Sequence, residues 1–488
     1  MSFHSVRLSK SSFKDGKKCA KRLWLRLNQP ELMVRDEAME ARAAIGQQVG
    51  LMGRGLNPGG IEIEGRTTRD RLVETERLLR EGHGVLYEAA FEEGGLYAQF
   101  DILYRVGEGW GIREVKAAKS INDGHVVDAV FQYLVLTRAG LKIDRVELVL
   151  IAQDAPSIEK SRVEDLLVVQ DLTDICRRDA EDLVPEIMAL LTTLSSGEAE
   201  QIEAGRHCEA TCPFLSHCFS GLSDDDLLFA PNLDKRKYAA LREAGYRRMS
   251  ELPAEMELSL RAEGVRRAIA SGREPWVSEK LGAALAEVRY PAVFLDFETA
   301  SPLFPVNNGM RGGELVVFQF SAHVLSEPSG AMAHYQFIDL DSEDPHPAIV
   351  AALTDVFKGA GSIMHYSPFE KRCLNRLMAA GVPGANALMG QFLKSSVDLE
   401  KFFGELVYHP KFRGKSSIKV VLPVMVPGLS YDDLEVKSGG MAEMSYVLAR
   451  TGELFGDDLA RRREALLKYC ERDTWAMVKL FERLLELR

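Results

Sequence analysis

The chain has 488 residues, of which 46% are hydrophobic and 27% are charged. This length predicts two or three domains, and this composition excludes a mostly disordered chain, a collagen-like fibre and a small disulfide scaffold. The formal charge of −11 excludes a basic nucleic-acid coat. No apolar run reaches the ~20 residues of a membrane helix, and the N-terminus lacks the apolar core of a signal peptide. We therefore expect a cytoplasmic α/β protein that does not span a membrane.

The N-terminal segment is basic although the whole chain is acidic. Residues 1–30 contain eight Lys or Arg residues and one acid, Asp15. Such a segment can contact phosphates, or it can be the solvated face of a helix, and the charge alone favours the solvated face. Residues 1–82 read as helical, with a break at Gly53–Gly60.

A pattern of strands follows this helical segment. Three runs are rich in β-branched and aromatic residues, and a helix and a buried strand come after them. The strands are expected at Val85–Phe91, Leu96–Arg105, Gly109–Lys116 and Arg145–Ala152, and the helix at Val126–Arg138. The remaining residues before the cysteine cluster at 208–218 read as helical.

Charged residues occupy related positions on these strands. Asp101 lies on the second strand, and Glu114 and Lys116 lie two apart on the third, so that both point to one face. Two carboxylates and a strand carbonyl suit Mg²⁺ or Mn²⁺, which can activate water at a phosphodiester. Lys116 could orient this water or stabilise developing charge, and Gln132, with Tyr133 beside it, could reach the same site from the helix. The alternative is a set of surface ion pairs, which a bare D…ExK pattern favours.

In this order, residues 8–220 resemble the RecB-like branch of the PD-(D/E)xK nucleases. The matching positions are Glu88, Asp101, Glu114, Lys116 and Gln132. One position departs from the family pattern, since many relatives place a metal-binding His after a G-x-x-V motif. Here Gly46–Val49 is followed by Gly50. Either Glu88 supplies the missing ligand, or the site is weaker.

Four cysteines bracket this first domain. Cys19 stands near its start, and Cys208-x3-Cys212-x5-Cys218 ends it. Four thiolates can hold tetrahedral zinc or a [4Fe–4S] cluster. The split arrangement resembles the iron–sulphur staple of CRISPR-associated RecB-like nucleases and of helicase–nuclease complexes. This resemblance favours [4Fe–4S], with zinc second, as a tie between the ends of the domain. The other three cysteines are expected to be ordinary buried residues: Cys176, Cys373 and Cys470.

A helical connector is expected next, after an acidic boundary at Ser223–Asp226. Residues 233–287 read as helical and polar, with breaks at Gly245 and Pro253. The run LREAGYRRMSELP resembles a single helix-hairpin-helix element that can contact a DNA backbone. A plain helical spacer explains it equally well.

The second α/β pattern begins at Tyr290. Strands are expected at Ala292–Phe297 and near 314–325 and 331–338, and helices at 346–358, 369–380 and 456–487. Asp296 and Glu298 lie two apart on the first strand, while Tyr469 and Asp473 lie four apart on the last helix. With Glu370 at a strand-to-helix turn, these acids could hold two divalent ions ~4 Å apart.

The order D-x-E, E, Y-x3-D resembles the DnaQ-like, DEDD-type 3′–5′ exonucleases, which have a ribonuclease H-like fold. The third acid of that family is usually Asp, whereas Glu370 occupies its place here, and Asp398 is an alternative or auxiliary ligand. His365 and His409 are expected to be structural. Residues 290–480 further resemble a bacterial family of unknown function, predicted to be nucleases of this type and usually preceded by a RecB-like domain. The resemblance rests on the runs FLDFET, VVFQFSAH, HYSPFEKRCL, HPKFRGKSSIKVVLP and YCERDTWAM.

These observations predict three regions: a RecB-like domain (1–222), a helical connector (223–288) and a ribonuclease H-like domain (289–488). The resemblances imply a metal-dependent nuclease with two active sites that acts on DNA, with RNA possible for the second. No G-x4-G-K-[ST] motif is present, so ATP-driven unwinding would need a partner helicase. One alternative is a nucleic-acid-binding module with one or both sites inactive. Another is a redox-sensing iron–sulphur protein.

Overall fold

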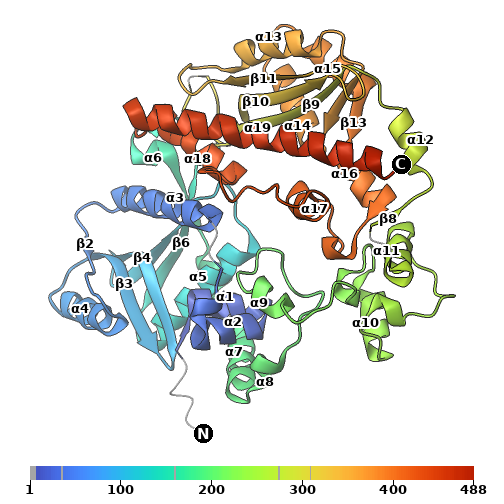
Figure 1. Ribbon diagram of the computed structural model, residues 1–488. Helices are drawn as coiled ribbons and strands as arrows, with labels where there is room; N and C mark the ends of the chain where they lie inside the picture. The colour runs from blue at the N-terminus through green and yellow to red at the C-terminus, as the bar shows by residue number, and fades with distance from the viewer. Residues whose placement is uncertain (1–6, 35–36, 159–160, 273–274, 308) are drawn as a thin grey trace. The chain divides into compact units, whose positions relative to one another are not determined.

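The computed structural model describes residues 7–34, 37–158, 161–272, 275–307 and 309–488. It is a mixed α/β protein with two compact units (Figure 1). Unit 1 comprises Met1–Ser220 with Leu303–Pro305, and unit 2 comprises Gly221–Pro302 with Val306–Arg488. The residues expected to form a separate connector thus belong to unit 2. None of the helices in the described ranges has the length and apolarity needed to span a membrane.

Unit 1 is built on a seven-stranded sheet with the order β2-β3-β4-β5-β6-β7, in which β1 pairs with the start of β4. β3, β4 and β5 form an antiparallel meander, and β6 returns parallel to β5 after helix α5. The strands are β1 (Leu8–Ser9), β2 (Ile61–Glu62), β3 (Val85–Glu93), β4 (Leu96–Val106), β5 (Gly109–Val115), β6 (Ile143–Ile151) and β7 (Leu167–Asp171).

Helices α5 and α7 pack together beside this sheet and share its main hydrophobic core. The side chain of Asn122 caps α5 by accepting a hydrogen bond from the backbone N–H of His125, 3.0 Å away. The helices of the unit are α1 (Lys10–Lys18), α2 (Ala20–Asn28), α3 (Glu37–Gly53), α4 (Thr68–Arg80), α5 (Asp123–Arg138), α6 (Val163–Leu166), α7 (Thr173–Ser195), α8 (Glu198–Gln201) and α9 (Leu215–Phe219), with short 3₁₀ turns at Pro30–Leu32 and Arg54–Leu56.

Three short strands lie in segments that the sequence predicts to be helical. β1 and β2 have two residues each, and β7 has five. Such strands are too short to show the alternation of apolar and polar residues that marks a strand. Pairing with β4, β3 and β6 stabilises them, which is a tertiary effect.

Unit 2 is built on a five-stranded sheet with the order β11-β10-β9-β12-β13. β10 runs antiparallel to β9, whereas β12 runs parallel to it. The apolar run of β9 places this strand at the centre of the sheet, where its residues are almost all buried. The strands are β9 (Ala292–Ala300), β10 (Val316–Leu325), β11 (Met332–Ile338), β12 (Ser362–His365) and β13 (Ser396–Asp398); β8 (Trp276–Val277) and β14 (Val407–Tyr408) form a separate pair.

Helix α19 crosses this sheet and contacts β9, β10 and β11 (Figure 1). Helices α13, α14 and α15 pack with residues of β9, β10 and β12 in a second hydrophobic cluster. The helices are α10 (Lys235–Glu243), α11 (Leu260–Ser271), α12 (Leu281–Ala286), α13 (His346–Phe357), α14 (Phe369–Ala379), α15 (Ala385–Ser395), α16 (Leu399–Lys401), α17 (Ile418–Met425), α18 (Gly439–Arg450) and α19 (Gly456–Glu486), with 3₁₀ turns at Leu227–Phe229, Met249–Glu251 and Pro410–Phe412 and a π turn at Phe402–Leu406.

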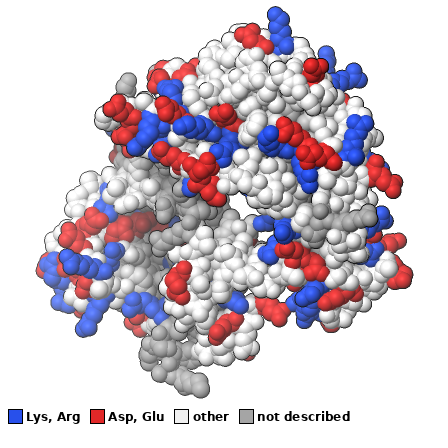
Figure 2. All heavy atoms as spheres, in the orientation of Figure 1, with Lys and Arg blue, Asp and Glu red and all other residues white. Residues whose placement is uncertain are grey.

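Basic and acidic side chains are interspersed over the face of the molecule in Figure 2, so the negative charge of the chain does not gather into one acidic surface there. The basic side chains near the N-terminus are paired inside unit 1. Lys10, Lys14, Lys17 and Lys18 each contact a carboxylate of another segment, and Arg22 and Arg26 both contact Asp15. This basic segment therefore supplies counter-charges to its own unit.

Candidate functional site

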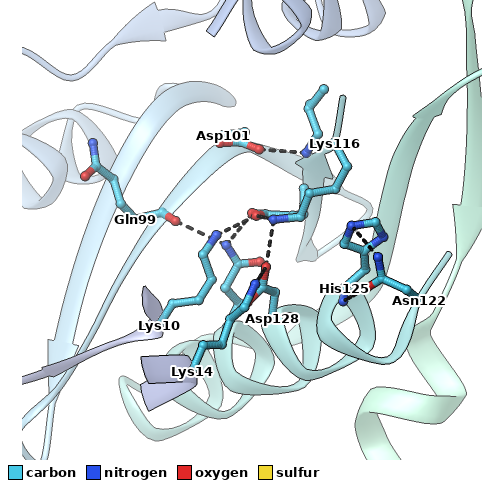
Figure 3. A network of polar contacts seen from close by, with 11 residues as sticks. Lys10, Lys14, Gln99, Asp101, Lys116, Asn122, His125 and Asp128 are labelled. Carbon is cyan, nitrogen blue, oxygen red and sulfur yellow. Dashed lines mark hydrogen bonds and ion pairs between the residues drawn. The ribbon is translucent and has the colours of Figure 1, made fainter. Parts of the chain in front are cut away.

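The first acid cluster lies where β4, β5, α5 and α1 meet in unit 1. We use this name for Asp101 and Glu114 together with Lys10, Lys116 and Gln132 (Figure 3). The register of β4 and β5 pairs Ile102 with Arg113 and thereby places Asp101 beside Glu114. Lys116 directly follows β5. The structure thus brings together four residues that the sequence predicted, and adds Lys10.

Both oxygens of Glu114 accept hydrogen bonds. The ammonium groups of Lys10 and Lys116 donate to Oε1 over 2.5 and 2.6 Å, and Nε2 of Gln132 donates to Oε2 over 2.5 Å. Burial favours the protonated carboxyl, but the two ammonium charges outweigh burial and hold the pKa of Glu114 at about 2. Glu114 is therefore a stable anion at neutral pH.

The pKa of Asp101 shifts in the opposite direction to that of Glu114, although the two residues lie side by side on β4 and β5. Its Oδ2 accepts a hydrogen bond of 2.6 Å from the backbone N–H of Val115. Burial, together with the negative charge of Glu114, raises the pKa of Asp101 to about 7. A cation placed between the two carboxylates would lower this pKa again, which is the behaviour expected of a metal ligand.

Asp128 is a further member of the site that the sequence did not reveal. It lies on α5, one turn before Gln132, and its Oδ2 accepts hydrogen bonds from Lys116 over 2.7 Å and from Lys14 over 3.1 Å. Lys10 and Lys14 lie four apart on α1, a spacing that puts both on one face of the helix. That spacing was a usable signal for Lys10 and Lys14, whereas Asp128 reads from sequence as an ordinary helix surface acid.

Glu88 lies on β3 and has a positive φ of 59°. Its carboxylate accepts a hydrogen bond of 3.0 Å from Gln99 and lies 3.7 Å from Arg54. Burial raises the pKa of Glu88, and the charge of Glu114 adds to the rise. Tyr133 packs against the hydrophobic core.

The position of Gly50 on α3 is open. A side chain there would meet no atom within 4 Å of its Cβ, whereas a Cβ at Gly53 would lie 2.6 Å from Val115. Helix α3 therefore approaches the end of β5 closely at Gly53, one turn beyond Gly50.

The four cysteines Cys19, Cys208, Cys212 and Cys218 line one small pocket in unit 1. Cys19 is the residue between α1 and α2, and Cys218 lies on α9. Lys18, Arg22 and Glu209 line the same pocket, and Lys18 donates a hydrogen bond of 2.7 Å to Glu209. Burial raises the pKa of Cys208 and of Cys218. Cationic groups beside the thiols would offset the charge of four thiolates.

The spacing of the sulfur atoms bears on which group they fit. A zinc ion with Zn–S bonds of about 2.3 Å would hold its sulfurs about 3.8 Å apart. No three of these sulfurs belong to a group of ligand atoms within 4.8 Å of one another in the described residues.

The second acid cluster, in unit 2, is formed by Asp296, Glu298, Glu370 and Asp473. The first two lie on β9, Glu370 lies in the first turn of α14, and Asp473 lies on α19. Glu298, Glu370 and Asp473 are buried. The structure therefore brings together all four acids that the sequence predicted, from three elements far apart in the chain.

The carboxylates of this cluster raise one another's pKa values. Burial, followed by the charges of Asp473 and Glu298, raises the pKa of Asp296 well above its usual range. Burial and Asp473 likewise raise the pKa of Glu298. Burial raises the pKa of Asp473 to about 6, although hydrogen bonds from Tyr431 and Tyr469 oppose the rise. Among the described residues, no Lys or Arg forms an ion pair with these acids as Lys10 and Lys116 do with Glu114, although the charge of Lys419 lowers the pKa values of Glu298 and Asp473.

Tyr469, which the sequence placed beside Asp473, lies buried on the same helix. Burial and the surrounding carboxylates raise the pKa of Tyr469 far above neutral pH, so its hydroxyl stays protonated and acts as a hydrogen-bond donor. Tyr431 was not predicted, and its hydroxyl donates to Oδ1 of Asp473 over 2.5 Å. Lys419, also not predicted, places its ammonium 5.5 and 5.9 Å from the rings of Tyr431 and Tyr469. Lys419 lies in one of the runs that carry the family resemblance.

Cys470 is buried, as expected, but it lies inside the second acid cluster. Its Sγ is 3.7 Å from Oδ2 of Asp296. Burial and the nearby acids raise the pKa of Cys470 well above its usual value, so the thiol remains neutral. Its neighbour Tyr469 was the only residue of this turn, besides Asp473, for which the sequence indicated a role.

Glu370 stands at the position for which the sequence comparison with DEDD-type exonucleases leads one to expect Asp. Its Oε2 is buried and has no hydrogen-bond partner among the described residues, while Nδ1 of His365 lies 3.6 Å away. Asp398 pairs with His365 in the register of β12 and β13, and its Oδ1 accepts the backbone N–H of Glu400. His409 accepts the backbone N–H of Lys411, a structural turn contact. Asp398 is thus a cap at the edge of the site.

One comparison with known families bears on this second site. Residues 293–417 match a domain of unknown function, DUF2779. The matched range contains Asp296, Glu298 and Glu370 and ends before Tyr469 and Asp473. No curated protein and no solved structure matches the chain.

The donors of both clusters fit hard divalent cations. Asp296, Glu298 and Cys470 each place one ligand atom within 4.8 Å of the others, and Glu370 adds a carboxylate oxygen without a partner. Carboxylate oxygens are the ligands of Mg²⁺ and Mn²⁺, while the neutral thiol of Cys470 does not suit them. In unit 1 Asp101 and Glu114 offer a smaller set of the same kind.

Proposed function

We propose that the chain is a metal-dependent nuclease with two active sites that hydrolyse phosphodiester bonds of DNA, one in each unit. The observation that carries this proposal is the second acid cluster. Four carboxylates from β9, α14 and α19 converge, and burial together with the neighbouring negative charges raises the pKa values of Asp296, Glu298 and Asp473. Burying several carboxylates together is costly unless a cation accompanies them.

The strand order of unit 2 supports a ribonuclease H-like fold and a DEDD-type 3′–5′ exonuclease. Central β9 carries the D-x-E pair, antiparallel β10 and β11 follow on one side, and parallel β12 and β13 lie on the other. Divalent ions held by Asp296, Glu298, Glu370 and Asp473 would activate water and stabilise the leaving oxygen. The Tyr469 hydroxyl would orient the attacking water, and the Lys419 ammonium would attract the phosphate.

The topology of unit 1 supports a RecB-like PD-(D/E)xK nuclease. The meander β3-β4-β5 is followed by α5 and by β6 parallel to β5, and the site lies where β4, β5 and α5 meet. Asp101 and Glu114 would hold Mg²⁺ or Mn²⁺. The carboxylates of Glu114 and Asp128 keep the pKa of Lys116 high despite its burial. Lys116 therefore stabilises negative charge as a cation, and Gln132 orients Glu114.

The cysteine pocket supports a [4Fe–4S] cluster as a structural tie, with zinc as the alternative. Cys19 belongs to the start of unit 1 and the other three cysteines to its last segment. Ligation by all four would close a loop of nearly the whole unit, and such closures stabilise a fold. DNA repair, recombination or defence against foreign DNA in the cytoplasm would suit this pair of activities, with a partner helicase supplying any unwinding.

The test is cleavage of 5′- and 3′-end-labelled single-stranded and duplex DNA with Mg²⁺ or Mn²⁺. Asp101→Asn and Asp296→Asn are compared with exposed controls in the same units, Asp182→Asn and Asp355→Asn. We expect each of the two site variants to lose a distinct set of products and the controls to retain both. Cleavage that persists in excess chelator, or that neither site variant changes, contradicts the proposal.

A second function has one specific observation in its favour. Both carboxylate oxygens of Glu114 accept short hydrogen bonds, from Lys10, Lys116 and Gln132. A unit 1 that keeps these bonds would bind nucleic acid without cutting it. Tight DNA binding by Asp296→Asn without any cleavage, under either metal and with single-stranded, duplex or RNA substrates, would favour this reading.

A further inference from the structure

Two histidines and a glutamate that belong to neither acid cluster gather on the α19 side of the unit 2 sheet. His323 on β10 and His334 on β11 are register partners, and Glu471 lies on α19. One ligand atom from each lies within 4.8 Å of the others. His323 is buried, whereas the side chains of His334 and Glu471 are 23% and 47% exposed. Solvent thus reaches the group from one side.

A chain of hydroxyl groups connects the two imidazoles. The Thr474 hydroxyl lies 3.0 Å from the backbone carbonyl of Glu471, 2.8 Å from the Ser321 hydroxyl and 2.9 Å from Nδ1 of His323. The Ser321 hydroxyl also lies 2.9 Å from Nε2 of His334. When Thr474 donates to the Glu471 carbonyl and Ser321 donates to Thr474, both neutral rings donate the N–H that faces these hydroxyls.

In that arrangement one lone pair remains on each ring, at Nε2 of His323 and at Nδ1 of His334. Nδ1 of His334, which lies 3.8 Å from Oε1 of Glu471, then faces another hydrogen-bond acceptor. A positive charge between the two acceptors would remove their repulsion. Burial lowers the pKa of His334 and lowers that of His323 to about 4, so both rings are neutral at pH 7, the form that ligates metals.

We propose that His323, His334 and Glu471 form a binding site for a first-row transition-metal ion such as Zn²⁺, separate from the second acid cluster. Imidazole and carboxylate ligands suit these ions, and metal-bound histidines characteristically donate their other ring N–H to an oxygen. Ser321 and Thr474 fill that role here. The site goes beyond the proposed nuclease function and does not depend on it.

The present arrangement of the rings sets a requirement for binding. The two imidazoles stack with centroids 4.4 Å apart and planes 21° apart. A metal ion lies near the plane of each ring that binds it, so one ring has to tilt. His334 lies on the edge strand β11 and is partly exposed, so it is the ring with room to turn. The bound ion would fasten β11 and β10 to α19, the helix that carries Tyr469 and Asp473.

The test measures Zn²⁺ stoichiometry and affinity by calorimetry on the full chain, after treatment with chelator, with Co²⁺ absorption as a second readout. His334→Phe keeps a ring in the stack, and Glu471→Gln changes a half-exposed side chain. Glu464→Gln, exposed and two turns away on α19, is the matched control. We expect wild type and control to bind one more Zn²⁺ than either site variant. Ser321→Ala, which removes only the orienting hydroxyl, should weaken that ion at least about tenfold.

Two outcomes overturn the proposal. One is equal Zn²⁺ stoichiometry in wild type, His334→Phe and Glu471→Gln. The other is loss of the ion in only one of the two variants, because the site needs both ligands. Ions held by the cysteines or by the second acid cluster are common to all variants and cancel in the comparison. The experiment measures Zn²⁺ binding and not DNA cleavage. A negative result for this site therefore does not bear on the nuclease proposal, and absence of nuclease activity would not change the Zn²⁺ result.

Discussion

Units 1 and 2 both gather carboxylates around the strands of a sheet, but they balance the charge differently. In the first acid cluster, Lys10 and Lys116 contact Glu114 directly and hold its pKa at about 2. In the second, burial and mutual repulsion raise the pKa values of Asp296, Glu298 and Asp473. The first cluster thus carries counter-charges of its own, and on our proposal the second would take them from bound cations. Four predictions, from the largest expected effect to the smallest, test this difference.

Lys10 and Lys116, the two lysines that contact Glu114, should contribute unequally to catalysis. In an Asp296→Asn background, Lys116→Met should lower kcat/KM of the remaining nuclease about 100-fold or more, because Lys116 supplies charge at the reacting phosphate. Lys10→Met should cost less than about tenfold, since a bound divalent ion replaces its charge beside Glu114. Lys17→Met is the control, because Lys17 also lies on α1 but its ammonium pairs with Glu186 on α7. Equal losses for both lysines would make Lys10 a catalytic residue.

Divalent ions should stabilise unit 2 more than unit 1. An ion at 100 times its dissociation constant adds about 2.7 kcal/mol to the free energy of unfolding. We expect Mg²⁺ or Mn²⁺ to raise the thermal midpoint of the full chain, with most of this rise lost in Asp296→Asn and kept in Asp101→Asn. Differential scanning calorimetry with and without chelator measures this change in the thermal midpoint. If the rise in the thermal midpoint is lost in Asp101→Asn and kept in Asp296→Asn, divalent ions stabilise unit 1 more than unit 2, which contradicts the prediction.

The metal-free stability of unit 2 should fall as pH rises from about 4 to about 6. Asp473 has a folded pKa of about 6 and an unfolded pKa near 3.8, so between these values the folded state binds the extra proton. Its deprotonation costs stability, and Asp473→Asn should flatten this part of the profile by roughly 1–3 kcal/mol. Glu114 acts oppositely: its lowered pKa gives stability above pH 4.5 that is lost as pH falls toward 2.

Urea unfolding in chelator, with hydrogen exchange in β9 and β12 reporting on unit 2, measures this profile. Asp355→Asn, an exposed acid on α13, is the control and should keep the wild-type slope. A wild-type stability that rises over this pH range would show that the acids of the second cluster have other positive partners.

We expect the length of the Glu370 side chain to suit its position in the second acid cluster. In an Asp101→Asn background, Glu370→Asp should lower exonuclease activity roughly threefold to tenfold, because the shorter side chain moves its oxygens away from the other acids. Glu435→Asp, an exposed change of the same kind, should have no effect. Product release from 3′-labelled DNA measures both. A gain in activity would mean that Glu at position 370 gives a less active site than Asp would.

The sequence predicted the acids of the second cluster better than their surroundings. Asp296 and Glu298 follow from the alternation of a strand, and Tyr469 and Asp473 from the spacing of a helix, which are local patterns. Lys419 and Tyr431 reach the site from segments without such a pattern, and tertiary packing alone brings them there. Cys470 was correctly expected to be buried, but burial gave no sign of its contact with Asp296.

In unit 1 the strands and the central helix followed from periodicity, while short strands such as β1 and β7 did not, because pairing rather than pattern stabilises them. The basic N-terminal segment is the instructive case. Its charge suggested either phosphate contacts or a solvated face. Lys10 and Lys14 instead neutralise buried carboxylates more than 100 residues away, a pairing that composition cannot reveal.

The separation of the second acid cluster along the chain has a consequence for synthesis on the ribosome. Asp296 and Cys470, which touch in the folded unit, are 174 positions apart. At roughly 5–20 residues per second, about 10–35 s pass between the emergence of β9 and that of α19. During this delay the central strand exposes its apolar residues and lacks its covering helix. A nuclease site formed by this cluster would therefore stay incomplete until α19 has docked, whereas the first acid cluster would be complete much earlier.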